Sequence, residues 1–270
     1  MAQATTPMRV PGVRPGLRVV ISAGAAGIGR AIADTFAAHG AHLVVSDIDE
    51  AALADFRAAH PSHLALHADA GDPVAVERFM GEALDRLGGL DVLVNNAGIA
   101  GPTAGIEAID PTEWHRTVAI NLDGVFHHTR HAVPALKDAA AEHGEAWITN
   151  LASVAGRLGF AYRTPYAATK WAVVGLTQSL SLELGPSGIR VNALLPGVVE
   201  GPRIERVFQG RARALGITPD EAKAQGLAKV ALGQMVTAQD IANMAIVLCS
   251  PLGHNIAGQP LSVCGHVFAL

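Results

Sequence analysis

Three residues in the second half of the chain have the types and spacing of a proton-transfer group. Tyr166 comes thirteen residues after Ser153, and Lys170 comes four residues after Tyr166. A tyrosine titrates near ~10 in water, so it needs a neighbouring cation to act as an acid or base at neutral pH. A lysine four residues further on lies on the same helix face and supplies that charge. We therefore expect Tyr166 to transfer a proton while the Ser153 hydroxyl orients the substrate.

A glycine-rich turn near the N-terminus has the pattern of a dinucleotide site. The apolar run of residues 17–21 predicts a buried strand, residues 22–29 read SAGAAGIG, and residues 30–39 predict an amphipathic helix. Such a turn lets the backbone approach a pyrophosphate, with the N–H groups of the helix pointing at the anion.

The next predicted strand ends at an acidic residue, Asp47. A carboxylate about twenty residues beyond the glycines accepts hydrogen bonds from the adenosine ribose and repels a 2′-phosphate. No arginine or lysine directly follows Asp47, and Ala26 in the turn is neutral. The sequence therefore predicts NAD as the cofactor rather than NADP.

Strands and helices alternate along the chain. Predicted strands cover residues 17–21, 43–46, 63–66, 91–94, 146–151, 190–194 and 261–264, and predicted helices include 30–39, 73–87, 112–136, 165–184 and 238–248. Repeated βα units imply a Rossmann-like α/β fold, a three-layer doubly wound parallel sheet of about seven strands with helices on both faces. The carboxyl ends of the strands, and with them all the motifs, then lie along one edge. We expect a flexible arm over residues 1–16, a single catalytic domain over 17–270, and a substrate lid at about 198–236.

Composition narrows the class of protein. The chain of 270 residues is half hydrophobic, carries a net charge of −4, and has no apolar stretch long enough to span a bilayer. Nucleic acid and an anionic membrane surface are therefore not expected partners, and we expect a cytoplasmic protein. Cys249 and Cys264 have no metal-binding spacing and are expected to be buried thiols.

With both motifs in place, the chain resembles the short-chain dehydrogenase/reductase family over about residues 17–264. The family signature is T-G-x-x-x-G-x-G: Gly27 and Gly29 match it, Ser22 and Ala23 replace its first two residues, and Gly24 lies one position late. Further matches in chain order are Asp69, Asn95, Asn96, Ala97, Gly98, Asn121, Pro196 and Gly197.

The resemblance implies a role for each matching residue. Tyr166 is the general acid/base, Lys170 lowers its pKa and binds the nicotinamide ribose, and Asn121 anchors a water in the proton path. The implied cofactor-binding residues are Ser22, Gly24, Gly27, Ile28, Gly29, Asp47, Asp69, Ala70, Asn96, Ala97, Gly98, Tyr166, Lys170, Pro196, Gly197 and Val199.

The resemblance also bears on metals and subunits. His127 and His131 have a spacing that can bind zinc, but no third ligand accompanies them and the family's mechanism needs no metal. We expect these histidines to pack at a subunit interface. Members of the family are usually dimers or tetramers, which implies a homo-oligomer, here expected to be a homotetramer.

The substrate pocket should be lined by residues 154–164 and by the lid. Candidate contacts are Ser153, Phe160, Tyr162, Arg163 and Arg203. The lid begins with four arginines, at 203, 206, 211 and 213, countered by Glu200 and Glu205. These arginines form either an ordinary solvated helix face or a site for an anionic group. Our hypothesis is that Arg163 or Arg203 contacts an acidic or polyhydroxylated substrate.

Three classes of function fit these observations. The favoured one is an NAD-dependent dehydrogenase or carbonyl reductase acting on a small secondary alcohol, sugar-like or anionic, and thus on CH–OH donors. The second is another reaction of the family, such as cis-dihydrodiol oxidation, enoyl reduction or dehydration; the Ser153-to-Tyr166 spacing argues against enoyl reduction. The third is a non-catalytic NAD sensor, although such proteins commonly lose the tyrosine or lysine that this chain keeps.

Overall fold

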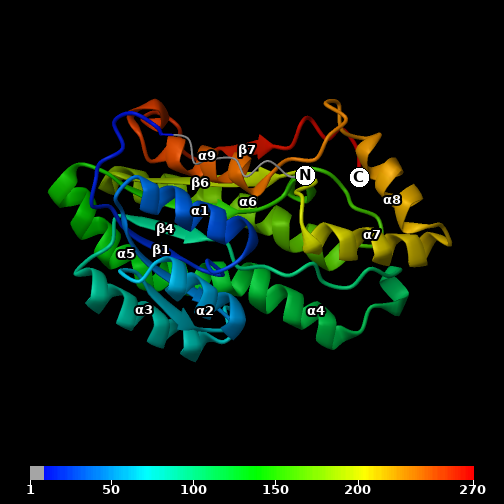
Figure 1. Cartoon of the computed structure of the whole chain (residues 1–270), viewed down its shortest axis with the longest axis horizontal. Coiled ribbons are helices and arrows are strands. Elements are labelled where there is room, and N and C mark those ends of the chain that lie inside the picture. Colours follow the sequence, from blue (N-terminus) through cyan, green and yellow to red (C-terminus); the bar gives the residue numbers. More distant parts are fainter. Residues whose placement is uncertain (1–8) are drawn as a thin grey trace.

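A parallel sheet forms the centre of the computed structural model, which describes residues 9–270 (Figure 1). Its strands are β1 (Arg18–Ile21), β2 (His42–Asp47), β3 (Leu64–His67), β4 (Val92–Asn95), β5 (Ala146–Leu151), β6 (Ile189–Pro196) and β7 (Pro260–Val263). Their order in the sheet is β3-β2-β1-β4-β5-β6-β7, and every pairing is parallel. The predicted Rossmann-like fold is confirmed.

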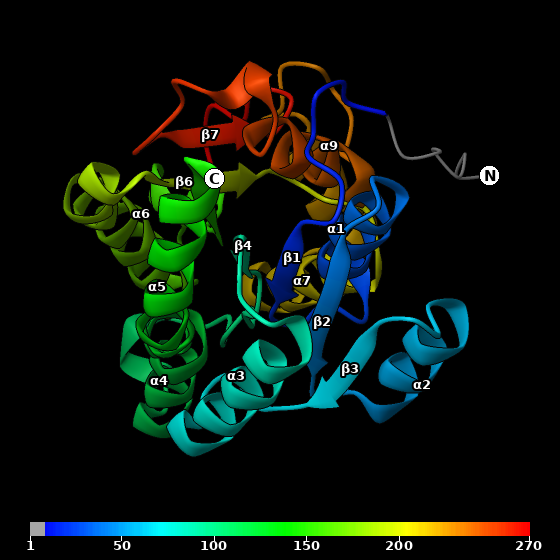
Figure 2. The ribbon, with the colours of Figure 1, turned by 90° about the vertical axis from the view of Figure 1, so that its left-hand side faces the viewer.

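Helices cover both faces of this sheet (Figure 2). They are α1 (Gly27–Ala38), α2 (Glu50–Ala59), α3 (Pro73–Leu87), α4 (Pro111–Val118), α5 (Gly124–His143), α6 (Thr164–Leu184), α7 (Pro202–Leu215), α8 (Pro219–Leu227) and α9 (Ala238–Leu248). Helices α1, α2 and α9 pack on one face, and α3, α5 and α6 on the other. The result is a three-layer arrangement.

Successive side chains of a strand point to opposite faces of the sheet, and this explains why helices cover both faces. In β1, Val19 and Ile21 pack against α1 and α9, whereas Val20 packs with the core under α3 and α5. All three side chains are fully buried. A strand that is apolar on both faces must be covered on both, as in parallel sheets generally.

The motifs converge where the strand order reverses, between β1 and β4. Ligands of doubly wound sheets bind beyond the carboxyl ends of the strands at such a switch point. Helices α7 and α8 stand beyond these same ends (Figure 1). They lie within the predicted lid, residues 198–236, whose two ends meet in a bridge between Val199 and Val236. The Glu200 N–H donates to the Val236 carbonyl, and the Val236 N–H donates to the Val198 carbonyl, both at 2.9 Å.

The described part of the predicted arm, residues 9–16, lies on the domain. Val10 is buried, and its N–H donates to Nε2 of His39 at 2.9 Å. Arg14 donates to the fully buried carboxylate of Asp91 at 2.6 Å, and Arg18 donates to the same group at 2.9 Å. Residues 1–8 of the arm lie outside the described residues.

One predicted helix is interrupted. The sequence pattern predicts a continuous helix over residues 112–136, but residues Ala119–Asp123 form a π-helical turn between α4 and α5. The wider turn inserts an extra residue per turn and rotates the side chains that follow. It carries Asn121, which is fully buried.

Candidate active site

Lys170 is held in place next to Tyr166 by a hydrogen bond to the backbone. Both residues lie in the first two turns of α6. Pro165 lies in the first turn of this helix, a position at which proline is favoured. The Lys170 ammonium donates to the Leu151 carbonyl at 2.6 Å and lies 5.8 Å from the centre of the Tyr166 ring. Burial lowers the pKa of Lys170 to about 8.

Tyr166 has neighbours that favour its phenolate. Burial alone would raise the pKa of Tyr166, but the charges of Arg203 and Lys170 oppose burial. The Ser153 side chain and the Arg163 charge act in the same direction, and the net pKa lies below its usual value. Ser153 follows β5, and its hydroxyl also accepts from the Ala155 N–H at 3.2 Å.

Asn121 joins this group through the π-helical turn. Its Oδ1 accepts from the Ile99 N–H at 2.7 Å, and its Nδ2 donates to the Ile99 carbonyl at 3.1 Å and to Oγ1 of Thr169 at 3.2 Å. Asn121 Oδ1 and Lys170 Nζ border the same point, because a Cβ added to Gly98 would lie 3.2 Å and 3.4 Å from them. The structure thus brings all four predicted catalytic residues together.

The glycine-rich turn reaches its shape despite the departures from the family signature. Ala23 adopts a left-handed backbone with φ +50°, a conformation that favours glycine. Its carbonyl accepts from Nδ2 of Asn96 at 2.8 Å. A Cβ at Gly29 would overlap that carbonyl, so Gly29 is needed for the close approach of α1 to the turn.

The turn also fits the diphosphate of a dinucleotide. The N-cap of helix α1 is Ala26, whose side chain cannot accept a hydrogen bond, and the first turn holds no acidic residue. Its N–H groups therefore remain available to an anion. A Cβ at Gly27, whose φ is +55°, would meet no described atom within 4 Å, so space remains beside the helix terminus.

Asp47 is oriented at the other end of this space. Its Oδ2 accepts from the Ala25 N–H at 3.2 Å, and its Oδ1 accepts from the Ile48 N–H at 2.8 Å and the Asp49 N–H at 3.2 Å. Asp49 lies beside it along the same cavity. Both acids therefore line the cavity beside the glycine-rich turn.

A cavity of about 650 Å³ connects the turn, the Tyr166 group and the lid. The predicted residues that line it are Gly27, Ile28, Asp47, Asn96, Gly98, Ser153, Phe160, Arg163, Tyr166, Lys170, Pro196, Gly197, Val199 and Arg203. One connected cavity therefore holds both the predicted cofactor groups and the predicted substrate groups.

Other predicted residues do not line the cavity. Those outside its lining are Ser22, Gly24, Gly29, Asp69, Ala70, Ala97, Asn121 and Tyr162. The Ser22 hydroxyl accepts from the N–H groups of Asn96 and Ala97, both at 3.0 Å, and so ties the glycine-rich turn to the end of β4. Tyr162 is 42% exposed and has a left-handed backbone with φ +63°.

The predicted lid lines the cavity with more residues than the individual candidates, and the last residues of the sequence add lining that the sequence did not predict. The lid contributes Arg206, Phe208, Arg211 and Lys229, and residues Val267, Ala269 and Leu270 complete the wall. The arginine-rich composition of 203–213 hinted at the first group. Nothing in the local sequence indicated the second.

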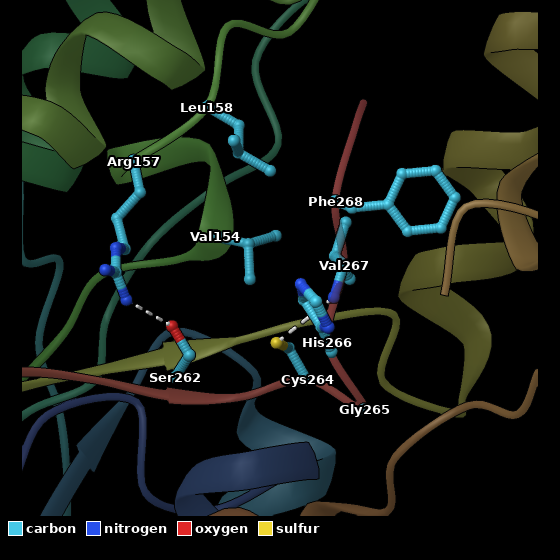
Figure 3. Close-up of a pocket in the computed structure, with 9 residues that line it drawn as sticks. All are labelled: Val154, Arg157, Leu158, Ser262, Cys264, Gly265, His266, Val267 and Phe268. Carbon is cyan, nitrogen blue, oxygen red and sulfur yellow. Dashed lines mark hydrogen bonds between the residues drawn. The ribbon is translucent and has the colours of Figure 1, made fainter. Parts of the chain in front are cut away.

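A further cavity, of about 590 Å³, lies on the other side of Val154 and Val267, which line both cavities (Figure 3). Arg157 donates to the Ser262 hydroxyl at 3.0 Å along one wall, and the Val267 N–H donates to Sγ of Cys264 at 3.4 Å along another. Cys264 is buried, as is Cys249, whose pKa burial raises.

In the part of the chain that the structure describes, no group of three or more His, Cys, Asp or Glu residues could hold a metal ion. His128, next to the predicted pair His127 and His131, is buried, and burial lowers its pKa to about 4. Within residues 9–270, no helix combines the length and the apolar character needed to cross a membrane.

Known proteins resemble this chain over most of its length. A family model described as enoyl-(acyl carrier protein) reductase matches residues 23–265. The trans-4-hydroxycyclohexanecarboxylate dehydrogenase of Sinomonas cyclohexanicum is 36% identical over 91% of this chain and 90% of its own. The sorbitol dehydrogenase of Cereibacter sphaeroides is 38% identical over 93% of this chain and 96% of its own.

A solved structure agrees with these matches. The 3-ketoacyl-(acyl-carrier-protein) reductase from Brucella melitensis, complexed with NADH, superposes with a TM-score of 0.82 at 32% identity, covering 93% of this chain and 98% of that chain. Together with the cavity and its residues, these similarities define the class: the chain belongs to the short-chain dehydrogenase/reductase family. It is an oxidoreductase that acts on CH–OH donors and their ketones.

Proposed function

We propose that this protein is an NAD-dependent dehydrogenase that interconverts a secondary alcohol and its ketone, with Tyr166 as the general acid/base. The observation that carries the proposal is the environment of Tyr166. A phenol with a lowered pKa lies beside Lys170 and Ser153 in a cavity that continues to the glycine-rich turn. Perturbed groups that converge in a cleft are typical of catalytic sites.

In this proposal each residue has a separate task. The phenolate of Tyr166 takes the hydroxyl proton of the alcohol, and the phenol returns it to the carbonyl oxygen in the reverse direction. The Ser153 hydroxyl holds the substrate oxygen and stabilises charge that develops on it. Lys170 keeps the phenolate stable, and Asn121 positions the segment around Ile99 next to it. A bound nicotinamide supplies the hydride acceptor or donor.

The choice of NAD rests on Asp47 and Asp49. Both line the cavity at the end of β2, and Asp47 is fixed by three backbone N–H groups. Their negative charges would repel a 2′-phosphate. Ser22, Gly24 and Gly29 would support the cofactor site from behind by shaping the turn, and Asp69 and Ala70 would border it after β3.

The chain carries a matched control for testing this function, because it contains two tyrosines. Tyr166→Phe should lower kcat for alcohol oxidation roughly 100-fold or more while NAD still binds in calorimetry. Tyr162→Phe, at an exposed position outside the cavity lining, should leave kcat unchanged. Turnover that survives Tyr166→Phe would disprove the assignment, and NADP turnover exceeding NAD turnover would disprove the cofactor choice.

We also propose that the protein is a cytoplasmic homotetramer. Large apolar side chains are exposed on two neighbouring helices, Phe126 on α5 and Trp171 and Leu182 on α6. Covering such side chains favours association between copies. Light scattering coupled to gel filtration would give the subunit number, and a monomer at micromolar concentration would contradict the proposal.

A further inference from the structure

We propose that the substrate is a hydroxy acid, whose carboxylate binds between Arg203 and Arg163 while its hydroxyl meets Tyr166. This inference rests on the proposed function, because it uses the same site. It goes further by naming the charge of the substrate and the residues that bind it.

Arg163 is an arginine in an unusual position. It is only 3% exposed, and its guanidinium carbon lies 5.1 Å from the centre of the Phe160 ring and 4.8 Å from that of Tyr166. Its Nη2 donates to the Ala100 carbonyl at 2.8 Å. Nε and Nη1 have no partner among residues 9–270. A buried cation with unused donors is costly unless an anion joins it.

Arg203 brings a second positive charge to the same ring. Its guanidinium carbon lies 5.9 Å from the centre of the Tyr166 ring, and its Nη1 donates to the Gly98 carbonyl at 2.9 Å. Burial lowers the pKa of Arg163 to about 10, and the repelling charge of Arg203 acts in the same direction. A carboxylate near both guanidinium groups would relieve this repulsion and accept their free N–H groups.

The residues around the cavity do not supply that carboxylate. In the described part of the chain, none of the pocket-lining arginines, at 163, 203, 206 and 211, forms an ion pair. The ion pair of the lid joins Lys223 to Glu205, outside the cavity lining. Glu200 lines the cavity, but within residues 9–270 it forms no ion pair with these four arginines, and Asp47 and Asp49 lie beside the glycine-rich turn.

The substrate end also has apolar lining. Phe160, which contacts Arg163, and Ile204, Val207 and Phe208, on the same helix as Arg203, line the cavity. A polyol needs a polar partner for most of its hydroxyls, whereas these walls suit a hydrocarbon skeleton. Because both guanidinium groups lie within 6 Å of the Tyr166 ring centre, the carboxylate should be only a few bonds from the reacting carbon.

The test compares substrates that differ only in charge. We would measure kcat/KM with NAD for trans-4-hydroxycyclohexanecarboxylate and 3-hydroxybutyrate against their methyl esters, and include sorbitol as a polyol. Wild type should favour each acid over its ester roughly 30-fold or more. Arg203→Gln should abolish most of this preference, and Arg203→Lys should retain part of it. Arg213→Ala, on the same helix but outside the cavity lining, is the matched control.

The ratio of kcat/KM for the acid to kcat/KM for its ester distinguishes substrate binding by Arg203 from an effect of Arg203 on Tyr166. If Arg203 acts only by stabilising the phenolate, Arg203→Gln will slow acid and ester equally, and the inference is overturned. Equal rates for acid and ester in wild type, or a preference for sorbitol, would overturn it too while leaving the dehydrogenase function intact.

A binding measurement decides the matter even without turnover. Calorimetry would follow the non-reacting probe cyclohexanecarboxylate binding to the NAD complex of wild type and Arg203→Gln. An affinity for cyclohexanecarboxylate that is at least tenfold lower in Arg203→Gln than in wild type would support the anion site. It would do so even if no alcohol reacts, in which case only the proposed reaction is disproved. No binding to wild type, or equal binding to both, would overturn the inference.

Discussion

Nδ2 of Asn121 donates to Oγ1 of Thr169, 3.2 Å away, and so links the π-helical turn to the residue before Lys170. The same side chain satisfies both the N–H and the carbonyl of Ile99. One amide therefore connects the segment after β4 with the start of α6.

Replacing Asn121 should affect stability and activity together. Asn121→Ala leaves the buried backbone groups of Ile99 without their partner, which should lower the free energy of unfolding by about 2 kcal/mol. It should also lower kcat, because Lys170 loses a neighbour that fixes its helix. Urea unfolding and steady-state rates would check both effects. An unchanged unfolding free energy would show that another group takes over these hydrogen bonds.

The rate of alcohol oxidation should depend on pH through Tyr166. Its pKa is lowered from the ordinary value, and the phenolate is the base, so kcat/KM should rise with pH with a midpoint below that of a free tyrosine. Arg203→Gln removes a cation that stabilises the phenolate, so the midpoint should move to higher pH. A pH–rate profile with a neutral alcohol would measure this shift free of any effect on a substrate charge. A midpoint that moved down would contradict the predicted sign.

Cofactor preference should depend on Asp47. Asp47→Asn keeps the shape of the side chain but removes the charge that repels a 2′-phosphate. We expect the ratio of kcat/KM for NAD over NADP to fall at least tenfold. Asp49→Asn, at the neighbouring acid of the same cavity, should lower the ratio less, because the Asp49 carboxylate is held at the start of α2, where it accepts from the N–H groups of Ala51 and Ala52. An unchanged ratio in Asp47→Asn would require another source of selectivity.

A single methyl group strains the glycine-rich turn. Because Ala23 has φ +50°, Ala23→Gly should raise the free energy of unfolding by about 1 kcal/mol. Ala31→Gly is the control, since Ala31 lies inside helix α1, where the change should lower the free energy of unfolding by about 1 kcal/mol. Thermal and urea unfolding would compare the two variants. Equal effects at both positions would show that backbone strain at Ala23 is not the cause.

Asp91 should make stability depend on acid. Burial alone would raise the pKa of Asp91, but the N–H and guanidinium groups of Arg18, with Arg14, hold it below its ordinary value of 3.8. Its contribution is therefore complete above the unfolded-state pKa and is lost as the pH falls through the lower, folded-state pKa. At pH 7, Asp91→Asn should cost about 2 kcal/mol. The difference between wild type and variant should shrink in urea titrations towards pH 3, and a constant difference would contradict the linkage.

Local sequence signals were sufficient for much of the fold. The predicted limits of β5, α3 and α9 match the structure, and helix caps explain two of these matches. Asp72 caps α3 ahead of Pro73, and Thr237 forms a capping box with Asp240 at the start of α9. Such signals act over three or four residues, so a sequence pattern can reveal them.

Features decided by distant contacts were not predictable in this way. Residues 119–123 continue the helical pattern of their neighbours, and their π-helical turn is stabilised by the bonds of Asn121 to Ile99. The burial of Arg163 against Phe160 likewise depends on how the loop after β5 folds back onto α6. An arginine at a helix start is ordinarily expected in solvent.

The bridge between Val199 and Val236 has a consequence for the evolution and engineering of this chain. It joins the first and last residues of the predicted lid by backbone hydrogen bonds, so the residues between them form a nearly closed loop. Lengthening such a loop lowers the free energy of unfolding little, by about 0.6 kcal/mol for each doubling of the loop length. Most of the cofactor lining lies outside it. The segment between these two valines can therefore be exchanged for that of another protein while the rest of the domain stays the same. Such an exchange is expected to change which substrate the protein accepts.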